Sequence, residues 1–100
     1  MWFPFSRYKV VGHSMEPTFR DGDPLWVNRL SYLFSSPKLD DIVTIQLQGQ
    51  RGKVLLKKIK KVTKDSKYFV EGLNKTDSYD SRHFGPIDKN KILGKVIKKY

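Results

Sequence analysis

The sequence contains no cysteine and only two histidines among its 100 residues. Without cysteine, neither a disulfide framework nor a thiolate metal cluster can form, so packing alone must hold the fold together. Two histidines make a poor zinc site, and the acidic pairs Asp21/Asp23 and Asp40/Asp41 lack the spacing of a calcium loop. The sequence therefore predicts neither a metal nor a cofactor.

Long apolar runs are also missing. The longest spans only a few residues, far below the ~20 that cross a bilayer, and the first residues, MWFPFSRYK, lack the apolar core of a signal peptide. We therefore expect no transmembrane segment in this chain. The protein is then either peripheral at a membrane or cytoplasmic.

Acidic residues are few relative to basic ones. Ten Asp and Glu stand against 20 Lys and Arg, and the net charge of +10 favours contact with a polyanion such as nucleic acid, anionic lipid or an acidic protein. What is present in quantity is apolar residues, at 38%, with 13% aromatics. This composition predicts one folded domain over residues 1–100, with residues 1–8 as a short aromatic N-terminal extension.

The apolar residues fall into short runs separated by turn residues. The runs RYKVVG, PLWVNRL, DDIVTIQLQ, KYFVEG and KILGKVIKKY predict strands, and hence a mostly β domain. Segment 53–63, KVLLKKIKKVT, is ambiguous, because its apolar residues have helical spacing while its neighbours favour an extended chain. Periodicity alone predicts a helix there.

The stretch GHSMEPTF, residues 12–19, contains the candidate nucleophile Ser14. A serine beside a proline is most often a turn residue, because its hydroxyl bonds nearby backbone groups. A Ser-His-Asp triad would need His83 to fold back onto Ser14, since His13 is a direct sequence neighbour. We regard that as the weaker hypothesis.

A lysine of the stretch 53–67 is a better candidate base. If it points inward among Leu55, Leu56 and Ile59, burial lowers its pKa from about 10.4 toward the ~7 to 8 at which it can accept a proton from a serine. An adjacent cation such as Lys58 acts in the same direction. A Ser-Lys pair is a known variant of nucleophile and base, and it needs no histidine, cysteine or metal.

Three motifs carry a family resemblance. GHSMEPTFRDGD resembles the nucleophile motif of the type I signal peptidases, the S26 family of serine proteases. LLKKI is similar to the family's basic motif, whose first basic residue is the general base, which implies that role for Lys57 and puts Lys58 where arginine is usual. EGLNKTDSYDSRHFGPI is similar to the third motif, matching it at Gly72, Asn74, Ser78, Asp80, Ser81, Arg82, Phe84 and Gly85.

The resemblance implies a single small domain of coiled, largely antiparallel sheets. Segment 53–63 is then expected to be extended, with Lys57 facing inward and Lys58 outward. The implied activity is a serine endopeptidase that removes an N-terminal leader or signal peptide from a protein substrate, with small side chains before the scissile bond. This hydrolase needs no cofactor.

The site that follows has Ser14 as nucleophile and Lys57 as general base. Ser78 would orient Lys57, and Asp80 and Arg82 would pair to fix the loop that carries Ser78. The oxyanion would be met mainly by the Ser14 backbone N–H. The expected substrate and oxyanion region comprises Gly12, His13, Met15 and Pro17.

The motifs depart from the family pattern at four positions. Leu73 replaces an aspartate, Lys58 replaces arginine, and Asp40 stands where a Gly-Asp turn would have its glycine. Gly12 stands where some bacterial members have a serine that donates to the oxyanion. Leu73 also motivates a further hypothesis, a catalytically inactive relative with a scaffold role.

The short chain before Ser14 leaves two hypotheses open within the family. A soluble protease resembling the maturation peptidases of nickel-containing superoxide dismutase would explain this short build. A peripheral signal peptidase would use an aromatic wedge and lysines at anionic lipid; the wedge residues are Trp2, Phe3 and Phe5.

A hypothesis from another class of protein is a basic β-barrel that binds single-stranded nucleic acid through exposed aromatics. The candidate aromatics are Trp26, Tyr32, Tyr68 and Phe69. This hypothesis does not explain the order of Ser14, Lys57 and Ser78, so we expect a protein substrate and no nucleic-acid partner.

Overall fold

Strands are the main secondary structure of the computed structural model, which describes residues 5–10, 12–33, 35–46, 54–74 and 79–99. In chain order its elements are β1 (Phe5–Lys9), β2 (Pro24–Asn28), β3 (Ile42–Ile45), β4 (Leu55–Val62), β5 (Tyr68–Glu71), the short helix α1 (Ser81–Phe84), the 3₁₀ turn η1 (Lys89–Lys91) and β6 (Ile92–Lys99). None of the helices in the described part of the chain is long and apolar enough to cross a membrane.

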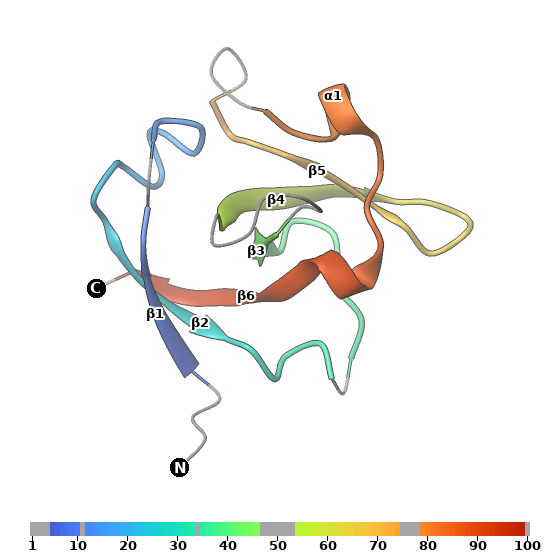
Figure 1. Ribbon diagram of the computed structural model, residues 1–100, viewed down its shortest axis with the longest axis horizontal. Helices are drawn as coiled ribbons and strands as arrows, with labels where there is room; N and C mark the ends of the chain where they lie inside the picture. The colour runs from blue at the N-terminus through green and yellow to red at the C-terminus, as the bar shows by residue number, and fades with distance from the viewer. Residues whose placement is uncertain (1–4, 11, 34, 47–53, 75–78, 100) are drawn as a thin grey trace.

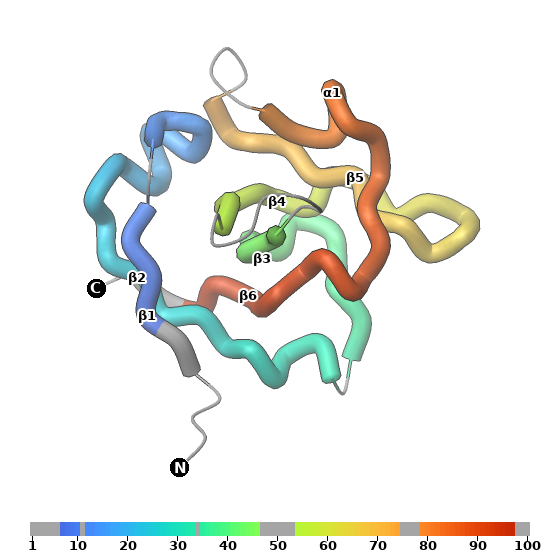
Figure 2. Tube along the Cα trace, viewed as in Figure 1, coloured from blue at the N-terminus to red at the C-terminus, as the bar shows by residue number. Residues whose placement is uncertain are grey.

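The strands form one six-stranded sheet in the order β1-β2-β6-β3-β4-β5, and every neighbouring pair is antiparallel. The sheet coils, so that its edge strands β1 and β5 lie on opposite sides of the molecule (Figures 1 and 2). The prediction of a mostly β, single small domain with a largely antiparallel sheet is confirmed. Residues 5–8, expected to belong to an N-terminal extension, are part of β1, which pairs with β2 along its length.

Segment 53–63 contains the strand β4. The extended conformation implied by the family resemblance is therefore correct, and the helix predicted from the spacing of the apolar residues is wrong. The physical reason is pairing on both sides: β4 supplies hydrogen-bond partners to the facing edges of β3 and β5, which a helix at this place would leave unpaired. Lys57 faces inward and is only 2% exposed. Lys58 points to the other face, where its side chain is 26% exposed and its Nζ lies 3.5 Å from Asp40 Oδ1.

Two apolar clusters pack on the two faces of the sheet. The larger core comprises Tyr32, Val43, Ile45, Ile59, Tyr68, Val70, Ile87 and Ile92, with Leu55 and Phe84 packed against it. The smaller core comprises Val10, Met15, Phe19 and Leu25, with Ile42, Leu56, Leu73 and Val96 packed against it. Alternate residues of β3 and β4 contribute to the two cores, as the period of two in a strand requires.

Two of the aromatics that the nucleic-acid hypothesis needed on the surface are buried instead. Tyr32 is 8% exposed and Tyr68 is 4% exposed, and both belong to the larger core. A buried ring cannot serve as a stacking platform for a base. The expectation that Tyr32 and Tyr68 are exposed is therefore wrong.

Asp40, which replaces the usual glycine, adopts the left-handed conformation with φ of 70°. Aspartate tolerates this region better than most residues, because its short polar side chain can bond locally. Its backbone N–H donates to the Ile59 carbonyl at 2.9 Å, and the Asp41 carbonyl accepts from the Ile59 N–H at 2.9 Å. The turn geometry expected of glycine is thus kept.

The carboxylate of Asp41 connects the β3 turn to the larger core. Its Oδ2 accepts from the Tyr32 hydroxyl at 2.7 Å and from the Lys38 backbone N–H at 3.1 Å, and Lys95 Nζ lies 3.5 Å from Oδ1. Burial by itself would raise the pKa of Asp41, but the Tyr32 and Lys38 hydrogen bonds and the Lys95 charge together lower it. The pKa of Tyr32 is raised, first by burial and then by Asp41, so its hydroxyl stays a donor.

We predict that Tyr32→Phe lowers the free energy of unfolding at neutral pH by about 1.5 to 3 kcal/mol, because a carboxylate loses a hydrogen bond. The lowered pKa means that Asp41 stabilises the fold above the ordinary carboxyl range and loses this effect as pH falls through its folded-state pKa. The difference between the wild type and Tyr32→Phe should therefore shrink as pH falls below about 4. Urea unfolding at a series of pH values measures it.

The matched control is Tyr79→Phe, which removes the same hydroxyl from a residue that is 52% exposed. Its effect should stay within about 0.5 kcal/mol of zero at every pH. A Tyr32→Phe difference that does not change with pH would contradict the role given to Asp41.

Candidate active site

Ser14 lies in a loop of successive turns that leads from β1 to β2. The loop is closed by backbone hydrogen bonds from Phe19 N–H to the Met15 carbonyl at 2.9 Å and from Glu16 N–H to the His13 carbonyl at 3.2 Å. Met15, 1% exposed, anchors the loop in the smaller core. Ser14 itself is only partly buried, so its hydroxyl is held near the surface by a buried neighbour.

The backbone around Ser14 is shaped by two further residues of the expected substrate and oxyanion region. Gly12 has φ of 87°, and its N–H donates to Asp21 Oδ1 at 2.9 Å. The peptide bond between Glu16 and Pro17 is cis. At Gly12 a side chain would find space but a strained backbone, so glycine suits the position.

Asn74 fastens the serine loop to the chain that follows β5. Its backbone N–H donates to the Ser14 carbonyl at 2.7 Å, and its side-chain Nδ2 donates to the His13 carbonyl at 3.0 Å. The third motif thus holds the first in place across about 60 residues of sequence. Leu73, the departure from the family pattern, packs against the smaller core under the same loop.

Lys57 lies on β4, between β3 and the edge strand β5. It pairs with Val43 of β3, and the register in which Lys58 pairs with Glu71 puts Gly72 opposite it on the β5 side. Gly72 and Asn74 are only two residues apart, so their backbones lie within about 7 Å. The Ser14 loop is therefore hydrogen-bonded to the chain just after β5, close to the place where Lys57 faces Gly72.

A cavity of about 40 Å³ opens beside Ser14. It is lined by Tyr8, Lys9, Val10, Ser14, Met15, Leu25, Thr44, Val54, Leu55 and Leu56. This volume holds roughly three water-sized spheres, which corresponds to a small side chain and excludes a ring. Leu55 and Leu56 precede Lys57 directly, so the cavity joins the serine loop to the strand that bears the lysine.

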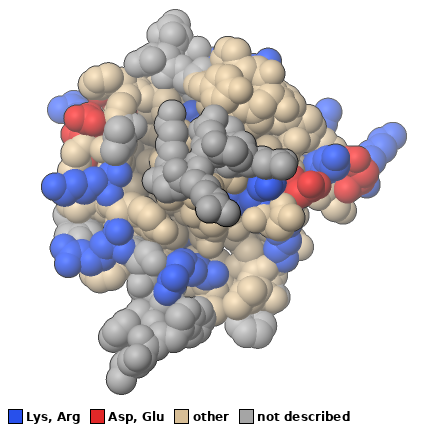
Figure 3. Space-filling view, viewed as in Figure 1, with Lys and Arg blue, Asp and Glu red and all other residues tan. Residues whose placement is uncertain are grey.

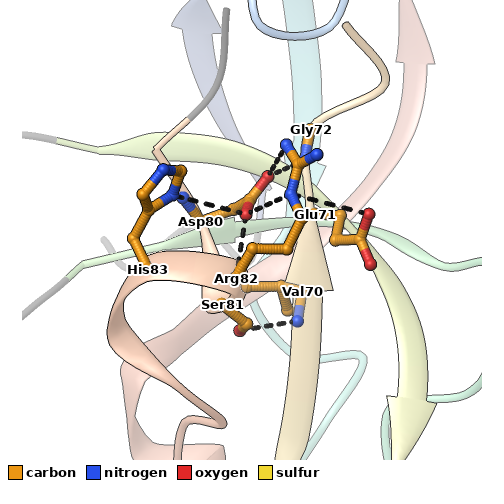
Figure 4. Close-up of polar contacts among 7 residues, drawn as sticks. All are labelled: Val70, Glu71, Gly72, Asp80, Ser81, Arg82 and His83. Carbon is orange, nitrogen blue, oxygen red and sulfur yellow. Dashed lines mark hydrogen bonds and ion pairs between the residues drawn. The ribbon is translucent and has the colours of Figure 1, made fainter. Parts of the chain in front are cut away.

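Asp80 and Arg82 form the predicted pair (Figure 4). Arg82 Nε donates to Asp80 Oδ1 and Nη2 donates to Oδ2, both at 2.9 Å, which is a bidentate arrangement. The pKa of Arg82 is raised, chiefly by this hydrogen bond. Asp80 is fully buried and also accepts from the Gly72 N–H at 3.0 Å and the Arg82 N–H at 3.1 Å.

These contacts hold the segment 79–84 against β5. Ser81 Oγ accepts from the Val70 N–H at 2.8 Å, and Asp80 caps the first turn of α1. The segment is thus fixed at Gly72, opposite Lys57. Ser78, the residue expected to orient Lys57, lies outside the described residues.

Both histidines are engaged in local contacts. His13 Nδ1 lies 2.5 Å from Glu16 Oε2, and His83 Nδ1 accepts from the Asp80 backbone N–H at 3.4 Å while its ring stacks on Tyr79 at 5.4 Å. Their side chains are 58% and 53% exposed. Within the ranges that the structure describes, no three acidic or histidine side chains are grouped to hold a metal ion.

The clamp made by Asn74 was missed as a role from the sequence, although the residue was matched in the third motif. We predict that Asn74→Ala, which removes the side-chain bond to His13, lowers the free energy of unfolding by about 0.5 to 1.5 kcal/mol. Amide hydrogen exchange in residues 12–19 should become faster, because this loop loses one of its anchors. Asn90→Ala, at an exposed residue of η1, is the control. Unchanged exchange in the loop would contradict the clamp.

Comparison with known proteins agrees with this geometry. The family model described as signal peptidase, peptidase S26 matches residues 1–63 and 58–100. Signal peptidase I V of Bacillus subtilis strain 168 is 32% identical over 142 aligned positions, covering 92% of this chain and 83% of that protein. Signal peptidase I of Bacillus caldolyticus is 32% identical, and the alignment covers 98% of this chain and 80% of that protein. Signal peptidase IB of Staphylococcus aureus strain Mu50 is 27% identical, and the alignment covers 94% of this chain and 76% of that protein. The chain therefore belongs to the peptidase S26 family of signal peptidases.

Proposed function

We propose that this serine endopeptidase uses Ser14 as nucleophile and Lys57 as general base to remove an N-terminal signal peptide from a protein substrate. The observation that carries the proposal is the burial of Lys57, which is 2% exposed on β4. A solvated lysine stays protonated at neutral pH, whereas burial disfavours its charged form. A base of this kind supports Ser-Lys chemistry without histidine or metal.

The attachment points around β5 support the pairing of these two residues. The Ser14 carbonyl is held by the Asn74 N–H, and Lys57 lies opposite Gly72, two residues earlier. The cavity beside Ser14 is lined by Leu55 and Leu56, the residues that precede Lys57. In the proposed dyad, nucleophile and base thus come from separate elements that both lie near the end of β5.

The proposed reaction has two stages. Ser14 Oγ attacks the scissile carbonyl while neutral Lys57 takes its proton, and the protonated lysine then gives the proton to the leaving amine. Water hydrolyses the acyl-enzyme, again with Lys57 as base. Ser78 is proposed to orient the Lys57 amine throughout.

The oxyanion is proposed to rest on the Ser14 backbone N–H. Gly12 offers no side-chain donor, and its own N–H already donates to Asp21. One strong donor in place of two predicts a slower enzyme than a relative with a serine at that position, since an oxyanion donor is worth about 10² to 10³ in kcat.

Asp80 is proposed to position the site rather than to transfer protons. Its two oxygens accept four hydrogen bonds, from Gly72 and from Arg82. A carboxylate that accepts this many hydrogen bonds is well placed to fix the groups around it. Its role is to hold the segment that leads back to Ser78.

The substrate class rests on the relatives, whose names describe signal peptidases. These relatives give no support to the superoxide dismutase maturation role or to nucleic-acid binding. A cavity of about 40 Å³ beside the nucleophile also suits the small side chain expected before the scissile bond.

The dyad makes a kinetic prediction. Ser14→Ala and Lys57→Ala should each remove nearly all cleavage of a leader peptide, and the double variant should be hardly worse, because residues that act as one unit are non-additive. Lys57→Arg should be equally inactive, since a guanidinium keeps its proton. The midpoint of the acidic limb of the kcat/KM profile should lie well below ~10.4, the pKa of a free lysine.

His13→Ala and His83→Ala are the controls for this experiment. Both should leave the acidic limb in place, because neither histidine takes part in the proposed proton transfer. Activity retained in Lys57→Arg, or abolished in a folded His83→Ala protein, would overturn the assignment in favour of a histidine base.

We further propose that the domain binds peripherally to anionic membranes through the side that carries β1. Arg7 and Lys9 are exposed on this edge strand, and Lys9 also lines the cavity beside Ser14. Figure 3 shows Lys and Arg side chains gathered on the side of the molecule where β1 and β2 lie. The predicted aromatic wedge falls outside the described residues, except for Phe5, which lies in β1.

This contact predicts sedimentation with anionic vesicles at low salt and release as ionic strength rises, because screening shortens the field to ~10 Å at 0.1 M. The double variant Arg7→Glu/Lys9→Glu should lose the binding. The same charge change in Lys64→Glu/Lys67→Glu, at the exposed β4–β5 turn, should retain most of it. Equal loss in both variants, or no binding by the wild type, would contradict a β1-side membrane contact.

A further inference from the structure

Thr44 lies in the wall of the cavity beside Ser14, and its hydroxyl is buried. Thr44 is 1% exposed, and its Oγ1 has no hydrogen-bond partner among the described residues. The residue lies in β3, in the middle of the sheet, and is not part of the proposed dyad. Its hydroxyl is thus a polar atom for which the described part of the fold supplies no partner.

The strand geometry turns Thr44 toward the cavity. Val43 and Ile45 belong to the larger core, so the residue between them points to the opposite face, as Ile42 also does. There it pairs with Leu56 of β4 and lines the cavity together with Ser14. On its other side β6 presents Gly94, which has no side chain to reach the hydroxyl.

Much of the cavity wall is apolar. Met15, Leu25 and Leu56 line it, and none of these side chains has an oxygen or nitrogen. An unpaired buried hydroxyl destabilises the fold, and valine would give nearly the same shape without that penalty. The penalty is relieved when a ligand brings a polar group into the cavity.

We propose that Thr44 is a specificity-determining residue, whose hydroxyl hydrogen-bonds a small hydroxyl side chain of the substrate, serine, in the cavity beside Ser14. This inference rests on the proposed function. The cavity volume of about 40 Å³ restricts the occupant to a side chain of that size. In an extended substrate, the first and third residues before the scissile bond point the same way, so serine at one of these two positions is selected.

The experiment compares leader peptides that carry serine or 2-aminobutyrate at the first or the third position before the scissile bond. The two side chains have nearly the same size, but only serine has a hydroxyl. At one of the two positions, the wild-type protein should cleave the serine peptide with a kcat/KM about tenfold higher than that for the 2-aminobutyrate peptide. This is the ratio expected for one buried hydrogen bond. The same pair at the second position, which points away, is the peptide control.

Thr44→Val should reduce the serine to 2-aminobutyrate ratio to about one or below, because the hydroxyl is replaced by a methyl group. Thr44→Ser keeps a hydroxyl and should keep the ratio above one. A thermal melt checks that each variant is folded, and Thr44→Val should melt no lower than the wild type if the hydroxyl has no partner in the free protein.

The outcomes separate this inference from the proposed function. A wild-type ratio near one at both positions, with normal cleavage, overturns the role of Thr44 and leaves the function intact. A ratio that survives in Thr44→Val overturns it as well. No cleavage of any leader peptide by the wild type contradicts the function itself, and this inference with it.

Discussion

The burial of Lys57 is the constraint on which the rest of this structure depends. An amine in the interior of a protein is tolerated when it is neutral or partnered, and a sheet that surrounds it with strands on both sides keeps water away from it. The surrounding architecture serves that end, because β3 covers one flank and β5 the other. Burial of this kind disfavours the charged form of an amine, which is the property that the proposed base requires.

The proposed dyad also requires that the Ser14 loop be held in place. Two side chains that follow β5 in the chain make the relevant bonds: the Asn74 amide donates to the His13 carbonyl of the serine loop, and the Asp80 carboxylate accepts from the Gly72 N–H. Both act on backbone groups, whose positions change little with sequence. The precision of the site therefore comes from strand ends and short polar bridges rather than from a large interior.

Much of this arrangement can be predicted from the sequence. The strands and the Asp80–Arg82 pair follow from local pattern and motif, because each depends on neighbours in the chain or on charge complementarity. The extended β4 follows from the family resemblance alone, since the local spacing of its apolar residues predicts a helix. Asn74 and Thr44 could not be interpreted in the same way. Their contacts depend on which strands pair and in what register, and a one-residue shift would turn Thr44 away from the cavity. The Asp41–Tyr32 bond also depends on the tertiary fold, and no local signal marks it.

The turn between β4 and β5 is short and closed by its own hydrogen bonds, from Lys67 N–H to Thr63 Oγ1, from Thr63 N–H to the Lys67 carbonyl and from Thr63 Oγ1 to Asp65. The two family-model matches meet at residues 58–63, just before this turn, and the alignments to the Bacillus relatives are longer than the chain itself. The relatives therefore carry residues that this chain lacks. Additional residues at the tip of this hairpin would leave the pairing of β4 with β5, and with it the register of Lys57, unchanged.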